Sequence, residues 1–154
     1  MKEIRAIALL LALIAARGNK SKAGELLSWA YGRTDHETDF FIKKYLTPTT
    51  TLPTRHEAAE FTKKYLVEGK WYDRERVWAV INQLPYEDFL STWYWKIIAH
   101  TVRQANHYRC AICGKKSKSL QVHHTTYSHH GAELHHLSDL QPLCPECHKR
   151  VHGK

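Results

Sequence analysis

CAICGKKSKSLQVHH, residues 110–124, and LQPLCPECHKRVH, residues 140–152, are the two stretches that decide the fold of this chain. Each stretch carries one CxxC pair, and together the pairs use all four cysteines of the protein. A structural zinc site takes four donors in a tetrahedron, and four thiolates complete it. The histidines in the same stretches are left over, so the sequence predicts a structural Zn²⁺ site and a second, separate group of metal ligands.

The predicted zinc ligands are Cys110, Cys113, Cys144 and Cys147. Gly114 follows the first pair and suits a tight turn, because glycine tolerates positive φ. Pro145 suits the first position of a helix, which would place Cys144 at the helix cap. Two disulfides in a secreted protein, or a redox pair, are the alternatives to zinc.

Four histidines lie where a hairpin and a helix would bring them together. Residues 120–124 read as a short strand that ends at His123 and His124, and residues 125–138 read as a polar loop. Residues 140–143 then lead into a final helix, on which His148 and His152 are four positions apart and share a face. The order strand, loop, extended segment and helix can therefore gather these four side chains.

At this point the residues resemble a known family. The pattern CxxC, then Val122-His123-His124, then Asp139-Leu-Gln-Pro-Leu-Cys-Pro-Glu-Cys-His148, then His152 resembles the HNH endonucleases in their zinc-stapled branch. The resemblance covers roughly Tyr86 to His152. It implies a ββα-metal fold and hydrolysis of DNA phosphodiester bonds with one catalytic divalent ion, Mg²⁺, Mn²⁺ or Zn²⁺.

The resemblance also implies roles for single residues. His124 stands at the place of the general base, and His123 at the place of the metal ligand just before it. His148 is then the metal ligand on the helix, and His152 an extra ligand or a phosphate contact. Asp139 stands where the family has its middle asparagine, which orients the loop of the general base. An ionised aspartate accepts hydrogen bonds but cannot donate them.

Other basic residues near the motif fit contact with a nucleic acid. Lys115, Lys116 and Lys118 follow the first CxxC and are predicted to contact the DNA backbone, although a solvated loop has the same composition. The paired histidines at 129–130 and 135–136 are interpreted as solvated or close to phosphate. The remaining histidines have no ligand spacing and are interpreted as structural: His36, His56, His100 and His107.

Residues 1–85 lie outside the resemblance and read as helical, so the predicted fold is mainly α with a small α+β unit at the C-terminal end. Residues 1–46 are predicted to form a helical region in which residues 16–27 resemble the turn and second helix of a helix-turn-helix, with Lys20 and Lys22 facing DNA. An αα-hairpin with solvated lysines is the alternative. Residues 47–54 read as a linker, residues 55–85 as a helical connecting region, and residues 86–154 as the nuclease domain.

Charge and composition favour DNA as the partner. The chain has 154 residues, and its 23 Lys and Arg against 15 Asp and Glu give a net charge of +8. Such a balance favours a polyanion, because neutralised phosphates release counterions. We expect neither a membrane nor a small-molecule substrate as partner, and the oligomeric state stays open.

The apolar run 7–16 resembles a signal peptide, but its helical spacing favours a buried helix and a cytoplasmic protein of a bacterial or phage-infected cell. A secreted nuclease is the alternative. A DNA-binding module with an impaired site is the alternative to a nuclease.

Overall fold

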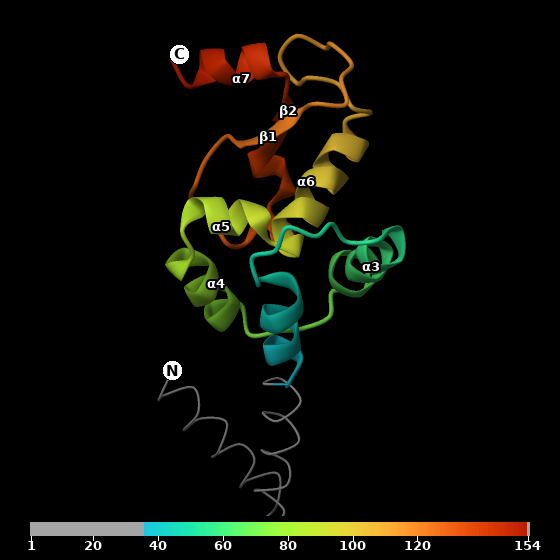
Figure 1. Ribbon diagram of the computed structural model, residues 1–154, viewed down its shortest axis with the longest axis vertical. Coiled ribbons are helices and arrows are strands. Elements are labelled where there is room, and N and C mark those ends of the chain that lie inside the picture. Colours follow the sequence, from blue (N-terminus) through green and yellow to red (C-terminus); the bar gives the residue numbers. More distant parts are fainter. Residues whose placement is uncertain (1–35, 154) are drawn as a thin grey trace, which may run out of the picture.

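A computed structural model of the chain describes residues 36–153 (Figure 1). Most of this part is helical, and a two-stranded hairpin followed by a helix forms its C-terminal end. The predicted fold class, mainly helical with a small ββα unit, is thereby confirmed. The helices, the helix-turn-helix and the DNA-contacting lysines Lys20 and Lys22 that the sequence predicts within residues 1–35 lie outside the described residues.

The helices begin where the sequence supplies side-chain caps. A helix over residues 36–45 is followed by α3 (Arg55–Phe61), which continues as the π-helical segment η1 (Thr62–Val67). Thr54 and Glu57 form a capping box at the start of α3, and Asp73 accepts a hydrogen bond from the Arg76 N–H at the start of α4 (Arg74–Gln83). Among the described helices, none has the length and apolar character to cross a bilayer.

The aromatic segment before the first cysteine pair forms two helices, α5 (Tyr86–Ser91) and α6 (Trp93–Ala105). The helical spacing of the sequence from residue 86 to residue 106 predicts one continuous helix, and this prediction is wrong at Thr92. The Thr92 backbone is extended, its side chain accepts a hydrogen bond from the Trp95 N–H, and its hydroxyl donates to the Phe89 carbonyl. The hydrogen bonds of this buried threonine end α5 and begin α6, although apolar residues continue at helical spacing across it.

One core of mainly aromatic side chains joins the described helices from residue 36 to α6. Phe41 stacks on Tyr72 with ring centroids 4.5 Å apart, and Tyr94 of α6 packs edge-on against Phe41 and Phe61. The same core includes Leu134 and Leu140 from the C-terminal unit. Burial of each such side chain stabilises the fold by about 1.5–3 kcal/mol. The ββα unit is therefore built on the helices through α6.

The predicted linker, residues 47–54, contains no helix or strand apart from an isolated bridge between Pro48 and Thr92. It is nevertheless held on α6. The Lys96 ammonium group donates to the Thr49 and Thr51 carbonyls, and the Trp93 indole N–H also donates to the Thr51 carbonyl. These bonds hold the segment on α6. The helices before and after it share one core.

The ββα unit consists of β1 (Gln121–His124), β2 (Leu140–Leu143) and α7 (Pro145–Val151). The strands are antiparallel, with His123 opposite Gln141 and His124 opposite Leu140. Two 3-10 turns, η2 (Glu133–His135) and η3 (Leu137–Asp139), lie between them. The hairpin contacts α6 on one side and α7 on the other (Figure 1). Because side chains alternate along a strand, His123 and His124 face different helices.

Candidate metal centre and the neighbouring histidine networks

The four cysteines come together at the junction of the ββα unit with the end of α6. Their sulfur atoms all lie within 4.8 Å of one another, and Cys113 Sγ and Cys144 Sγ are 3.8 Å apart. Two sulfurs bound to one tetrahedral Zn²⁺ at about 2.3 Å are separated by roughly 3.8 Å. A disulfide needs about 2.05 Å, and all four cysteines are free. The cluster fits a structural zinc site, as the sequence predicts.

Hydrogen bonds favour the thiolate form of Cys110, whereas burial raises the pKa of Cys147 to about 11. Cys144 is the cap of α7, and its sulfur accepts a hydrogen bond from the Cys147 N–H, while the Arg150 guanidinium donates to the Cys147 sulfur. Burial raises the pKa of the Cys110 thiol, but backbone hydrogen bonds outweigh burial and bring the pKa down to about 6. The thiolate is the form that binds zinc.

His123, His148 and His152 form a second group, the three-histidine cluster, between β1 and α7. The His148 and His152 Nε2 atoms are 3.2 Å apart, close to the roughly 3.3 Å between two nitrogen ligands of a tetrahedral zinc ion. The three ring planes meet at 80°, 87° and 69°. A metal lies in the plane of each imidazole that binds it, so rings at such angles can direct their nitrogens at one ion.

The surroundings of His123 and His148 favour neutral imidazoles. Burial lowers the pKa of His123, and the neighbouring His152 and His148 lower it further. Burial and His152 likewise lower the pKa of His148. A neutral imidazole is the form that binds a metal. The residues present therefore fit one divalent ion with three nitrogen ligands.

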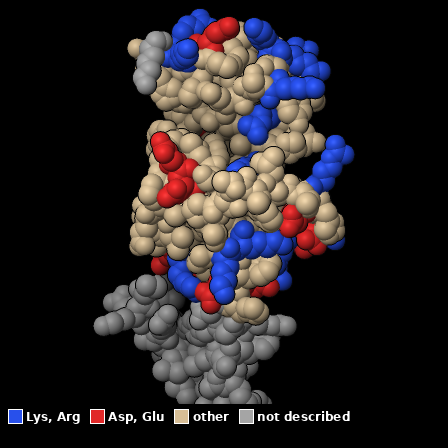
Figure 2. Space-filling model, in the orientation of Figure 1, with Lys and Arg blue, Asp and Glu red and all other residues tan. Residues whose placement is uncertain are grey.

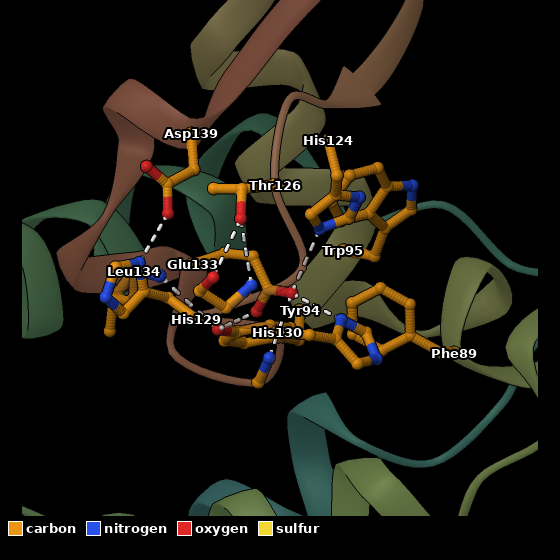
Figure 3. A network of polar contacts seen from close by, with 12 residues as sticks. Phe89, Tyr94, Trp95, His124, Thr126, His129, His130, Glu133, Leu134 and Asp139 are labelled. Carbon is orange, nitrogen blue, oxygen red and sulfur yellow. Dashed lines mark hydrogen bonds and ion pairs between the residues drawn. The ribbon is translucent and has the colours of Figure 1, made fainter. Parts of the chain in front are cut away.

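His124 lies on the opposite face of β1, in a buried network around the Glu133 carboxylate (Figure 3). Its side chain is only 2% exposed, and its Nε2 is 3.1 Å from Glu133 Oε1. His130 Nδ1 and the Gly131 N–H reach the same oxygen at 2.8 and 3.0 Å. The Tyr94 hydroxyl donates to the other oxygen of Glu133. The structure thus separates His124 from the three-histidine cluster.

Glu133 is an ionised carboxylate inside the protein. Burial by itself raises its pKa, but hydrogen bonds from His124, His130 and the Gly131 N–H outweigh burial and hold the pKa well below its usual value. The His124 ring is covered on its faces by Trp95 and Tyr127, each with its centroid 5.0 Å away and nearly parallel. His124 Nδ1 is buried and has no hydrogen-bond partner.

Asp139 does not reach His124 through its side chain. Its carboxylate is 2.6 Å from His129 Nδ1, and its backbone carbonyl accepts from the N–H and the hydroxyl of Thr125, the residue after His124. His129 stacks on His136 with centroids 3.7 Å apart and planes at 6°. Parallel rings this close cannot both have one ion in their planes, so a hydrogen bond and a ring stack, and not a shared ion, account for this arrangement.

Basic side chains surround the end of the molecule that carries α7 and the first cysteine pair (Figure 2). Lys115, Lys116 and Lys118, for which the sequence predicts contact with the DNA backbone, are exposed. Within residues 109–150, all of which the structure describes, Glu146 is the single exposed acidic side chain. The exposed basic residues here are Arg109, Lys115, Lys116, Lys118, Lys149 and Arg150. A surface of this charge attracts phosphates.

Three residues of this region were not expected from the sequence: Glu133, Tyr94 and Tyr127. Glu133 stands in a polar loop, and Tyr94 lies nearly 40 positions earlier along the chain in a helix of similar aromatics. The sequence feature nearest to Glu133 is Gly131, two positions earlier. A glycine there indicates a tight loop, but it does not indicate a buried carboxylate.

The comparison with protein families agrees with this geometry. Residues 110–154 match the model of the HNH endonuclease family. No curated protein and no solved structure matches the chain. HNH endonucleases are generally phosphodiester hydrolases, and the four-cysteine cluster lies inside the matched segment. Residues 110–154 of this chain therefore form an HNH endonuclease domain with a CxxC…CxxC cysteine cluster.

Proposed function

We propose that the chain is a metal-dependent DNA endonuclease whose three-histidine cluster holds one divalent ion and whose general base is His124. The observation that carries the proposal is the convergence of His123 from β1 with His148 and His152 from α7, within an HNH domain. The basic surface at the same end of the molecule supports DNA as the substrate.

The ion, when bound, would act as a Lewis acid that stabilises the negative charge developing on the phosphate and on the departing oxygen. Histidine ligands favour zinc over manganese or magnesium by affinity, whereas phosphate chemistry commonly uses magnesium. His123, His148 and His152 would hold the ion and keep one side of it open to DNA. Four exposed cationic side chains on the first cysteine loop and α7 would hold the flanking phosphates: Lys115, Lys116, Lys118 and Lys149.

His124 would take the proton of the attacking water on Nδ1. That atom is the free acceptor of the ring, because Nε2 is engaged with Glu133 and Nδ1 has no partner. The ring is covered by Trp95 and Tyr127. Trp95 belongs to the core, whereas Tyr127 is 55% exposed, so movement of Tyr127 is the route by which DNA would reach Nδ1.

A DNA-binding module without cleavage is the second candidate. The specific observation in its favour is the burial of His124 on the face of β1 opposite His123. In this case the basic surface would bind DNA and the four-cysteine cluster would stabilise the domain, while the phosphodiester bonds stay intact.

Cleavage of supercoiled plasmid distinguishes the two candidates. The purified full-length chain is incubated with plasmid and Mg²⁺, Mn²⁺ or Zn²⁺, beside the variants His124→Ala and His123→Ala. A nuclease of the proposed kind converts the plasmid to nicked or linear DNA, and each variant loses at least about a hundredfold in rate. Zinc content and circular dichroism are measured to check that both variants remain folded.

His56→Ala is the matched control, because His56 is a histidine whose side chain is 82% exposed and contacts only Glu60 on its own helix. It should cut at the parental rate. Cleavage by His124→Ala at the parental rate would refute the assignment of the base. Binding of plasmid without any cleavage, under every ion, would establish the second candidate.

A further inference from the structure

We propose that Glu133 is a positioning residue for His124: its carboxylate holds the imidazole in the tautomer that carries the proton on Nε2 and leaves Nδ1 as the acceptor. The proposal rests on the proposed function of His124 as general base. It assigns a role to a side chain that the family resemblance does not supply.

The hydrogen bonds around Glu133 determine which nitrogen of His124 carries the proton. An ionised carboxylate can only accept, so the contact of 3.1 Å between Oε1 and His124 Nε2 requires a proton on Nε2. The other donors to this carboxylate are His130 Nδ1, the Gly131 N–H and the Tyr94 hydroxyl. Four donors stabilise the ionised form, so no proton on Glu133 competes for His124.

Packing keeps both partners in place. Glu133 is 2% exposed, and its bond from Tyr94 anchors it to α6, the central helix of the core. The His124 ring lies between Trp95 and Tyr127, with interplanar angles of 13° and 21°. A half-turn of the ring about the Cβ–Cγ bond would keep its plane between the two aromatic rings but would break the bond to Glu133. One ring orientation and one tautomer are therefore strongly preferred.

A purely structural histidine would not account for Nδ1. Buried polar atoms are nearly always hydrogen-bonded, and each unpaired one costs about 1–3 kcal/mol. Here the carboxylate is satisfied on both oxygens, yet the second nitrogen of His124 has no partner. A ring nitrogen without a hydrogen-bond donor, on a histidine whose other nitrogen is held by a carboxylate, is the arrangement that a positioned proton acceptor requires.

Asp139 leaves this role to Glu133. The family resemblance assigns to position 139 the orientation of the loop that carries the base. The Asp139 backbone carbonyl does accept from the N–H of Thr125, next to His124, but the Asp139 carboxylate contacts His129 and not the His124 ring. The side chain that touches the His124 ring nitrogen is Glu133. The orienting contact thus comes from the loop between the strands.

The test uses the full-length, zinc-loaded chain and two independent readouts. Long-range ¹⁵N–¹H correlation spectra at pH 8 report the tautomer of His124 directly. Plasmid cleavage reports kcat and KM for the parent, Glu133→Gln and Glu133→Ala. Glu87→Gln is the control, because Glu87 is an exposed carboxylate on α5. All variants are checked for zinc content and for bound Mn²⁺.

We expect the parent and Glu87→Gln to show the proton on Nε2 of His124. Glu133→Ala should show a mixture of tautomers and a kcat at least about tenfold lower, with KM changed less than about threefold, since only the orientation of the base is lost. Glu133→Gln keeps a carbonyl acceptor, so it should retain more of the tautomer and of kcat than Glu133→Ala.

The outcomes separate this inference from the proposed function. Parental cleavage in a folded Glu133→Ala, or a proton on Nδ1 of His124 in the parent, overturns the role of Glu133 and leaves the nuclease intact. Absence of cleavage by the parent under every ion overturns the proposed function, and the positioning role with it. If Glu133→Ala does not fold, the kcat and spectrum of Glu133→Gln and the spectrum of the parent still test the positioning role of Glu133.

Discussion

Gly131 is the residue at which the loop between the strands meets α4. Its φ of +91° is strained for any other residue, and a Cβ there would lie 2.8 Å from Trp78 Cδ1. We expect Gly131→Ala to destabilise the protein by about 1–3 kcal/mol for the contact, in addition to the backbone strain. Urea denaturation measures the change.

Gly69→Ala is the control, because Gly69 has a φ of +61° and no atom within 4 Å of the added Cβ. It should show the backbone strain alone, about 1–2 kcal/mol. Equal effects of the two variants would contradict the predicted contact.

Glu133 also makes stability depend on pH. Its pKa in the folded protein is held below the value of about 4.3 expected in the unfolded chain, so the unfolded state binds the proton more readily. The stabilisation is fully present above about pH 4.3 and is lost as the pH falls toward the folded pKa. The free energy of unfolding of the parent should therefore fall more steeply below about pH 4.3 than that of Glu133→Gln.

Urea titrations at several pH values from 6 down to 3 measure this slope. Glu87→Gln removes an exposed carboxylate on α5 instead, and it should keep the steep parental slope. Parallel pH profiles for the parent and Glu133→Gln would show that the buried carboxylate carries no such linkage.

At the scale of a single element, we expect the folding of α7 to depend on zinc. This helix has seven residues, too few for a stable helix in isolation, and two of the four cysteines, Cys144 and Cys147, stand at its start. We expect removal of zinc with a chelator to expose the amides of α7 and of the hairpin to hydrogen exchange, while amides of α6, buried in the aromatic core, keep their protection.

Hydrogen exchange followed by mass spectrometry measures this difference. A chelator would also strip the three-histidine cluster, so His148→Ala serves as the control: it lacks a ligand of that cluster but keeps all four cysteines. It should retain the protection of α7. Unchanged exchange of α7 after zinc removal would contradict the structural role of the cysteine cluster.

For the whole molecule, the distribution of charge predicts how DNA binding responds to salt. The basic residues near the first cysteine pair and α7 face a common end of the protein (Figure 2). If Lys115, Lys116 and Lys118 each neutralise one phosphate, the triple change to Gln should reduce the slope of log affinity against log salt concentration by up to about 2.7. Affinity at low salt should fall for all sequences alike, because phosphate contacts carry no sequence information.

Fluorescence anisotropy with a duplex at several salt concentrations measures the slope. Lys43→Gln is the control, because Lys43 is an exposed lysine on the helix over residues 36–45, remote in Figure 1 from α7. It should leave the slope unchanged. A triple variant with the parental slope would place the DNA-binding surface elsewhere.

Much of the C-terminal unit could be predicted from local sequence. The CxxC spacing, the proline after Cys144 and the histidines four apart on one helix each depend on residues that are close in the chain. The hairpin, α7, the cysteine cluster and the meeting of His123 with His148 and His152 followed from them, as did the HNH resemblance. Metal ligands are specified by residue type and spacing, which a sequence displays directly.

The position of His124 and its partners was decided only by the tertiary structure. Nothing in the order of residues indicates that Glu133 of the loop bonds both Tyr94 of α6 and His124, or that Thr92 divides the aromatic helix in two. These contacts join residues up to 40 positions apart and exist because the aromatic core brings α6 against the hairpin. A buried carboxylate is stable only where several distant donors converge on it, and that convergence is a property of the packed molecule, not of any segment of its sequence.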